Sequence, residues 1–559
     1  MANLSTVFSN KLADAGISNN AVVYADSDDL PISGVTAGTL SFVSGNNSLY
    51  VWNGSSWFNV ATINTVPIFE TTPNDTYNLA NDGTATVITL AARDSEEVPL
   101  LWSYELISGS LGSTTITNDS SVFTITPSTD NSDAGEFTLA FKASDGINIA
   151  SDSAVFSLAF GPVLVQTLDN PNAYGTSAQD FFSRSVSISG NYAIAGAHQE
   201  DAGARTSAGK AYIFNVSTGA LLHTLDNPTP YGTAQNDFFG FSVAISGNHA
   251  IVGAYQEDDA DGSSSGKAYI YNVTTGALVH TLDNPDAYGA GDNDQFGYSV
   301  GISGNYAIVG AQAEEDAGGS AAGKAYIFNV TTGALSRTLD NPNGYGTSAS
   351  DFFGNAVAIS GNYAIVGANS EDDAGGELSG KAYIFNVTTG TLLHTLDNPN
   401  AYGTSAFDSF GSSVALSDTY AIVGAYGEGD ASGTASGKAY IFNISTGTLL
   451  HTLDNPNAFS TSTNDTFGWS VAISDTYAIV GANQEDESAL GSTGKAYIFD
   501  VATGSLLHTL DNPNAYDTSA GDQFGYSMST SDNYAIIGAI FEKDAGGTQS
   551  GKAYIYNLN

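Results

Sequence analysis

Three kinds of side chain that could bind a ligand or a metal ion recur along the C-terminal part of the sequence at a constant step of 57 residues. The first is an aromatic ring, which can stack on a sugar when carboxylate and amide groups stand beside it. The alternative is that the ring pins its loop against the next repeat. The ring is found at Tyr174, Tyr231, Tyr288, Tyr345, Tyr402, Phe459 and Tyr516.

The second recurring group is an Asp that precedes an apolar, strand-like segment. We expect that segment to be the innermost of its repeat, so these carboxylates are predicted to rim a central channel and to bind a ligand together with the aromatic rings. The alternative is that each Asp accepts backbone N–H bonds in a turn, which Asp does well. The positions are Asp180, Asp237, Asp294, Asp351, Asp408, Asp465 and Asp522.

The third recurring group is a Glu, at Glu200, Glu257, Glu314, Glu371, Glu428, Glu485 and Glu542. In the second repeat Glu257 is followed by Asp259 and Asp261, which imitates the alternate ligand spacing in the first half of a calcium loop. The bidentate Glu that completes such a loop is missing. A Ca²⁺ ion on these three carboxylates is one prediction, and a solvated acidic loop is the other. The sequence requires no further cofactor.

Basic residues recur as well, and they are interpreted structurally. A Lys opens one strand of every repeat and is predicted to form exposed ion pairs for local charge balance. A His recurs on another strand but gives way to Gln166 and Arg337 in two repeats, which indicates an exposed face. No repeat departs coherently from the others to form a cluster of acid, base and nucleophile, so the sequence predicts no enzyme. A lone site near the ends of the array remains a weaker hypothesis, built on Arg184, His198, Arg205 and Lys543.

Composition limits the partners of this chain. It has 559 residues, a formal net charge of −44 and no Cys. The charge disfavours nucleic acid and anionic membrane surfaces, and the lack of Cys excludes disulfides and thiolate metal sites. No run of about 18 apolar residues is present, and the start of the chain has no basic and apolar signal segment. We therefore expect neither membrane insertion nor signal-dependent export.

The recurring groups must be positioned by a repeat architecture. The motif T-L-D-N-P begins at seven positions from Thr167 to Thr509, and each repeat contains four short segments rich in β-branched and aromatic residues. Seven four-stranded units of this kind predict a seven-bladed β-propeller. The array begins with a segment of the fourth, outermost kind, and its last repeat lacks its own fourth segment. The first strand is therefore predicted to pair with the last strand and close the ring.

Loop lengths indicate which face of the ring binds a ligand or partner. Two of the four links in each repeat are long, and in a meandering blade both lie on the same face, which is therefore the candidate binding face. Because the same groups recur in all seven repeats, this face is predicted to be a multivalent surface.

Phrases such as F-G-F-S-V-A-I-S-G-N-H-A-I-V-G-A followed by G-K-A-Y-I-Y resemble the FG-GAP repeats of integrin-α-like propellers. The resemblance implies adhesion or ligand binding, and one branch is similar to a seven-bladed lectin. Integrin-type repeats carry a calcium-binding acidic loop between their first two strands. Here that link is a short S-G-N or S-D-T turn, so the family's calcium assignment does not carry over.

The segment before the ring divides in two. Residues 1–63 form a small β-rich module, and its phrase L-Y-V-W-N-G-S-S-W-F resembles amino-terminal modules of structural proteins of marine bacteriophages, especially those of cyanobacteria. Residues 64–162 alternate like an immunoglobulin-like or cadherin-like β-sandwich and are predicted to be a spacer. The propeller then occupies residues 163–559, which makes the whole chain all-β.

The order of anchor, spacer and head predicts an acidic virion structural protein of a bacteriophage, such as a tail fibre or a head decoration. Residues 1–63 would contact other virion proteins, and the long-loop face of the propeller would attach to a host-surface glycan or protein. The protein would be made in the host cytoplasm and located in the virion. Two alternatives stay open: a decoration protein that contacts only other virion subunits, and a bacterial cell-surface adhesin.

Overall fold

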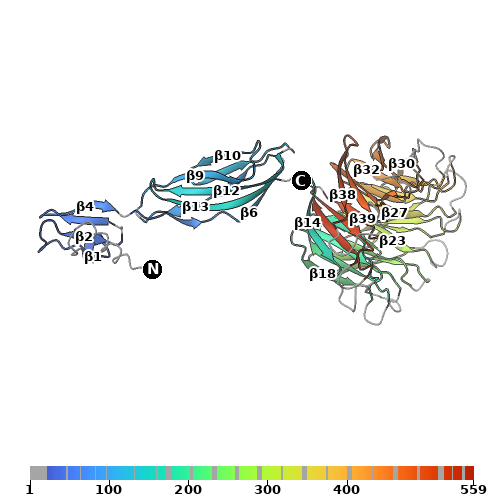
Figure 1. Cartoon of the computed structure of the whole chain (residues 1–559). Helices are drawn as coiled ribbons and strands as arrows, with labels where there is room; N and C mark the ends of the chain where they lie inside the picture. Colours follow the sequence, from blue (N-terminus) through green and yellow to red (C-terminus); the bar gives the residue numbers. More distant parts are fainter. Residues whose placement is uncertain are drawn as a thin grey trace. The chain divides into compact units, whose positions relative to one another are not determined.

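The computed structural model describes the chain from residue 22 to residue 558, apart from short gaps. The described ranges are 22–45, 48–62, 64–81, 83–95, 97–130, 133–158, 161–171, 179–201, 206–228, 236–258, 263–285, 293–315, 319–342, 349–372, 376–399, 406–429, 434–456, 464–486, 491–513, 521–531, 533–543 and 548–558. The chain divides into two compact units, residues 1–161 with 559 and residues 162–558. Figure 1 shows the strands of both units.

The first unit begins with a four-stranded sheet in the order β1-β2-β3-β4, in which only β1 and β2 run parallel. Trp52 and Phe42 are buried in this small module, and the ring of Trp57 lies 5.5 Å from that of Trp52. Phe58 is exposed. Its elements are β1 (Val22–Tyr24), a short 3-10 helix (Ser27–Asp29), β2 (Leu40–Val43), β3 (Ser48–Trp52) and β4 (Trp57–Thr62).

The rest of the first unit is built from a three-stranded sheet, β10-β11-β7, a four-stranded sheet, β6-β13-β12-β9, and the pair β5-β8. Phe123 and Phe156, one from each larger sheet, lie in one hydrophobic core, as in a sandwich. The elements are β5 (Ile68–Thr71), β6 (Thr76–Leu79), β7 (Thr86–Thr89), β8 (Ala91–Arg93), β9 (Leu101–Ser108), β10 (Thr115–Asp119), β11 (Val122–Thr126), β12 (Gly135–Ser144) and β13 (Ile149–Leu158). The resemblance to immunoglobulin-like or cadherin-like spacers stays a prediction.

The second unit consists of seven four-stranded antiparallel sheets, the blades, as the repeat predicts. Blade 1 is β15 (Phe182–Ser189), β16 (Tyr192–Ala197), β17 (Lys210–Asn215) and β18 (Leu221–Asp226); blade 2 is β19 (Ser242–Ser246), β20 (His249–Ala254), β21 (Lys267–Asn272) and β22 (Leu278–Asp283); blade 3 is β23 (Phe296–Ser303), β24 (Tyr306–Ala311), β25 (Lys324–Asn329) and β26 (Leu335–Asp340). Blade 4 is β27 (Phe353–Ser360), β28 (Tyr363–Ala368), β29 (Lys381–Asn386) and β30 (Leu392–Asp397); blade 5 is β31 (Ser413–Leu416), β32 (Tyr420–Ala425), β33 (Lys438–Asn443) and β34 (Leu449–Asp454); blade 6 is β35 (Phe467–Ile473), β36 (Tyr477–Ala482), β37 (Lys495–Asp500) and β38 (Leu506–Asp511).

Blade 7 contains both ends of the array, because β39 (Phe524–Thr530), β40 (Tyr534–Ala539) and β41 (Lys552–Asn557) are completed by β14 (Val163–Asp169). The strand β14 pairs antiparallel with β41, from Val163 opposite Asn557 to Asp169 opposite Lys552, and Figure 1 shows β14 beside the red strands of the chain end. The Nζ of Lys552 also lies 3.1 Å from Oδ1 of Asp169. The predicted pairing of the first strand with the last is confirmed.

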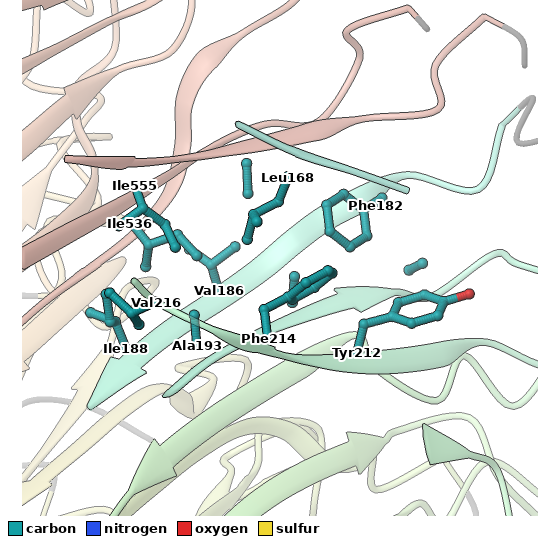
Figure 2. Close-up of a cluster of buried hydrophobic side chains, with 13 residues drawn as sticks. Leu168, Phe182, Val186, Ile188, Ala193, Tyr212, Phe214, Val216, Ile536 and Ile555 are labelled. Carbon is teal, nitrogen blue, oxygen red and sulfur yellow. The ribbon is translucent and has the colours of Figure 1, made fainter. Parts of the chain in front are cut away.

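Apolar side chains from neighbouring blades share one core at each interface. Between blades 7 and 1, Leu168 of β14 and Ile555 of β41 pack with Val186 and Phe214 of blade 1, and Figure 2 shows this cluster. The second and third strands of each blade are buried on both faces, which explains why they are apolar at nearly every position. Burying one blade therefore requires its neighbours, and the ring is stabilised as a whole.

Candidate functional site

A cavity of about 370 Å³ lies on the axis of the ring, lined by the first strand of every blade. Its most variable lining position is the second residue after the buried Phe that lies at, or just before, the start of each of these strands. The seven blades contribute, in order, Arg184, Phe241, Tyr298, Asn355, Ser412, Trp469 and Tyr526. The flanking residues hardly change from blade to blade, so this position makes the channel asymmetric.

A bulge at the start of the strand aims this position into the channel. In blade 3 the pairing of β23 with β24 shifts register between Phe296 and Ser299, and Gly297 between them has φ 90°. A Cβ on Gly297 would lie 2.3 Å from the carbonyl oxygen of Lys267, so a side chain is excluded there. Blades 2 to 7 all have this Gly, whereas blade 1 has Ser183 with φ 69°, a strained conformation for a residue with a Cβ.

Aromatic rings from consecutive blades form one side of the channel. The ring of Phe241 lies 5.0 Å from that of Tyr298 and 4.4 Å from that of Tyr255, which follows the second strand of blade 2. On the other side of blade 1, Trp469 lies 5.6 Å from Tyr526 and 5.1 Å from Tyr426. These rings constitute an aromatic arc, defined as Trp469, Tyr526, Phe241 and Tyr298 with Tyr255 and Tyr426. All except Phe241 are partly exposed.

The guanidinium of Arg184 lies inside this arc. Its Cζ is 4.0 Å from the ring centre of Phe241 and 5.2 Å from that of Tyr526, which is cation–π geometry. His198, packed against Phe181, Phe238 and Phe241, is buried beside it. Burial, followed by the charge of Arg184, lowers the pKa of His198 to about 3, so this imidazole is neutral at physiological pH.

Blades 4 and 5 supply a polar arc, defined as Asn355, Asn369 and Ser412, all of which line the cavity. The Nδ2 of Asn355 donates to the carbonyl oxygen of Ser412 at 3.4 Å. The side-chain oxygens of Asn355 and Asn369 are buried and have no hydrogen-bond partner within the protein as described. Buried polar atoms of this kind are rare in folded proteins and are suited to hydrogen bonds from a ligand.

The Asp residues predicted to rim the channel lie elsewhere, so that placement is wrong. Each is buried, with 2–5% exposure, and none lines the cavity. Each accepts a hydrogen bond of 2.8–3.1 Å from the Asn of the preceding T-L-D-N-P motif, for example Asn284 Nδ2 to Asp294 Oδ2. The bond fixes the two ends of the loop between blades. The Asp does precede the innermost strand, but its carboxylate is buried against the Asn and does not line the cavity.

The recurring Glu residues are also interior groups. Each is at most 1% exposed and accepts a hydrogen bond of 2.5–2.8 Å from the Tyr twelve residues later, as Glu371 does from Tyr383. Burial raises the pKa of Glu371, Glu428, Glu485 and Glu542 to about 7 and that of Glu257 to about 8. The prediction of a solvated acidic loop is therefore wrong for the Glu residues themselves, which are buried.

The calcium prediction finds no geometric support at Glu257, because both of its carboxylate oxygens accept from Tyr269 Oη at 2.7 Å. Asp259 and Asp261 lie outside the described residues. Within the described ranges, no group of three or more His, Asp or Glu side chains is arranged to hold a metal ion.

The repeated Lys residues form ion pairs as predicted, but five of the seven are buried, and Lys495 and Lys552 are partly buried. Lys324 Nζ lies 2.6 Å from Glu314 Oε1, and Lys210 and Lys381 pair with Asp226 and Asp397 at the end of the same blade's outer strand. Lys210 is 1% exposed. The burial of Lys210 and Lys381 could not be predicted from the sequence, because the Asp that pairs with each of them is on another strand.

The recurring His residues on the outer strand do more than cover an exposed face. Nε2 of His223 lies 3.1 Å from the carbonyl oxygen of Thr274 in the next blade, and His280 makes the same contact with Thr331. Gln166 and Arg337 donate to the corresponding carbonyl oxygens. The position therefore tolerates any side chain with an N–H donor of suitable length. The predicted aromatic residues Tyr174, Tyr231, Tyr288, Tyr345, Tyr402, Phe459 and Tyr516 all lie outside the described residues.

Sequence reasoning named Arg184 and His198 only as part of a lone site near the ends of the array, and it missed the other channel residues because it looked for groups that recur in all repeats. The opposite signal was available. Aligned at the 57-residue step, the repeats differ most consistently at the position of Arg184 and at the position of His198, which follows the second strand. Both positions lie at the end of the blade where the long loops begin, since Phe296 and Ala311 pair there in blade 3.

The structure is therefore that of an all-β protein whose C-terminal unit is a seven-bladed β-propeller with an axial cavity. The family model for the FG-GAP repeat matches seven segments that together cover more than half of the chain, so the chain belongs to the FG-GAP repeat family. The matched residues are 172–214, 229–271, 287–328, 345–385, 400–442, 458–499 and 514–556.

Similar solved structures are distant. A quinonprotein alcohol dehydrogenase-like protein from Bacteroides thetaiotaomicron is 12% identical, with a TM-score of 0.34, covering 80% of this chain and 96% of that one. The β-propeller domain of the Trilobed protease from Pyrococcus furiosus is 8% identical, with a TM-score of 0.35, covering 64% and 88%. No curated protein sequence matches the chain. None of the helices in the described ranges is long and apolar enough to cross a membrane.

Proposed function

We propose that the chain is a non-catalytic binding protein whose propeller holds a saccharide at the long-loop mouth of the central channel. The observation that carries this proposal is the concentration of blade-to-blade differences at one place, as an aromatic arc facing a polar arc. Aromatic faces stack on the apolar faces of sugar rings, while amide and hydroxyl groups bond the sugar hydroxyls. The cavity of about 370 Å³ lies within the range of small-ligand sites, roughly 300–1,000 Å³.

The lining also supports binding without catalysis. Among the described residues that line the cavity there is no Asp, Glu, His or Lys, so no pair of groups stands ready for general acid and base chemistry. The nearby His198 is buried among aromatic rings and is held neutral. Glycoside hydrolysis, which needs two carboxyl groups at the scissile bond, has no candidates in this lining.

We further propose that this binding head belongs to a virion structural protein of a bacteriophage and attaches the particle to a host-surface glycan. The support is the resemblance of the phrase at residues 49–58 to phage structural modules and the order of small module, sandwich and propeller along the chain. Mass spectrometry of purified particles tests this placement. A chain lacking residues 1–63 should be missing from particles, and incorporation of that shortened chain would contradict the proposed anchor.

Glycan binding is tested on an array of oligosaccharides with the full chain and two variants. Trp469→Ala removes the largest ring of the arc and should lower affinity by about fivefold to thirtyfold, because stacking contacts of this kind are worth about 1–2 kcal/mol. Phe407→Ala is the matched control, since Phe407 is 61% exposed and does not line the cavity. Binding that survives Trp469→Ala would move the site away from the channel, and no binding to any glycan would favour a decoration protein.

A further inference from the structure

Arg184 is an exception among the basic residues of this chain. The sequence holds 14 Lys and Arg against 58 Asp and Glu, so a basic group is expected to find a carboxylate. In the described ranges all seven repeated Lys residues, Lys142 and Arg93 lie in ion pairs. Arg337 donates to backbone carbonyl oxygens. Arg184 has neither kind of partner within the described part of the structure.

The position of Arg184 explains why it stays unpaired. Its guanidinium lies over Phe241 and near Tyr526, and no carboxylate is among the described residues that line the cavity. Stacking covers the face of the guanidinium but uses none of its N–H groups, which lie in its plane and form a fork suited to a carboxylate or sulfate. The channel mouth is thus a local positive site on a strongly acidic protein.

The backbone beneath Arg184 is held in an unfavourable conformation. Ser183 has φ 69° where every other blade has Gly, and it is fully buried with its hydroxyl oxygen lacking a hydrogen-bond partner in the protein as described. Strain of this kind persists only where the surrounding structure enforces it, and it clusters at binding sites. Here the bulge places Arg184, the one charged residue at the variable lining position of the seven blades, in the channel.

The polar arc lies on the opposite side of the ring, because blades 4 and 5 are farthest from blade 1 in a ring of seven. The unpartnered side-chain oxygens of Asn355 and Asn369 are acceptors for hydroxyl groups. A ligand that spans the channel would therefore meet a cation with aromatic faces at one end and hydroxyl acceptors at the other.

We infer that the channel mouth binds one anionic saccharide per ring, with its carboxylate or sulfate group on Arg184, its sugar ring on the aromatic arc and its hydroxyl groups at Asn355 and Asn369. This inference rests on the proposed saccharide binding and adds the charge of the ligand and the stoichiometry. It replaces the predicted sevenfold surface with a single site, since only blade 1 supplies the cation.

Isothermal titration calorimetry of the full chain tests the inference with three oligosaccharides of equal length: one of glucuronic acid, one of sulfated glucose and one of unmodified glucose. The wild-type protein should bind at least one acidic ligand about tenfold or more tightly than the neutral one, with one site per chain. The two acidic arms show whether a carboxylate or a sulfate is preferred. Because the contact is ionic, the preference should shrink as salt is raised.

Arg184→Gln should bring acidic and neutral ligands to within about twofold of each other, whereas Arg184→Lys should retain part of the preference. Arg337→Gln, which removes a positive charge on an outer strand, should leave the preference unchanged. Equal binding of acidic and neutral ligands by the wild-type protein, or seven sites per chain, would overturn the inference while saccharide binding itself stands. Failure of all three ligands, and of the glycan array, would instead reject the saccharide site.

Discussion

Two layers of each blade differ in how much their residues vary from blade to blade. The buried layer behind the channel, here called the repeated layer, is nearly constant, whereas the layer at the channel mouth, the channel layer, varies. Behind the channel, every blade repeats the same buried bond between a Glu and a Tyr, with a Lys and an Asp close by. At the channel mouth, the seven blades present an Arg, a Phe, two Tyr, an Asn, a Ser and a Trp at one equivalent position.

The difference has a geometric reason. The Glu–Tyr bond lies within a single blade and has the same surroundings seven times, so one solution serves all repeats. The axis is the place where side chains of all seven blades come together, so differences there combine into one asymmetric surface. We therefore expect changes in the repeated layer to affect stability and changes in the channel layer to affect binding.

The largest expected effect is from Glu371→Ala. It leaves the buried hydroxyl of Tyr383 without an acceptor and opens a cavity, which should lower the free energy of unfolding by about 2–4 kcal/mol. Thermal and denaturant unfolding measure this loss. The matched channel variant Ser412→Ala should cost less than about 0.5 kcal/mol. An equal loss of unfolding free energy in the two variants would contradict the division into a layer that determines stability and a layer that determines binding.

A second effect is a dependence of stability on pH. The pKa of Glu371, Glu428, Glu485 and Glu542 is about 7 in the folded chain, above the ordinary value of 4.5, so the folded state holds these protons more tightly than the unfolded state. Their contribution is fully present below about pH 4.5 and is lost as the pH rises through about 7. A tenfold change in the acid dissociation constant between the unfolded and folded states is worth about 1.4 kcal/mol.

Melting temperatures from pH 5 to pH 8 should accordingly fall. Most surface carboxylates stay ionised over this range, so the general acidity of the chain adds little to the slope. Glu428→Gln keeps an acceptor for Tyr440 but cannot titrate, and it should reduce the slope by the share of one blade. A melting temperature that rises with pH would show that these Glu residues are charged in the folded protein.

The smallest effect is expected on the outer strand. His280→Ala removes the bond to the carbonyl oxygen of Thr331 in the next blade and should cost about 0.5–1 kcal/mol. His280→Gln should recover most of this loss, because Gln166 makes the equivalent bond to Ser217 at 2.8 Å. Unfolding in urea measures both. If Gln fails to restore stability, the contact depends on the imidazole ring and not on its N–H donor.

Much of the fold can be predicted because it depends on period and pattern. The 57-residue step, the four β-rich segments and the missing last strand predict seven blades and the pairing of β14 with β41, which is what the structure shows. The site is less predictable. Acidic residues in loops are usually solvated, so Asp294 and Glu371 are expected on an exposed face, but both accept buried hydrogen bonds from other segments.

The number of blades, the closure of the array and the acidity that disfavours nucleic acid and anionic membranes follow from spacing and composition, which can be read along the chain. Which side of each strand faces the axis depends on three-dimensional packing, because the two-residue bulge that begins at Gly297, and its equivalents, set that direction. The closed ring then brings Arg184, Trp469 and Asn355, which are far apart in the sequence, to one cavity.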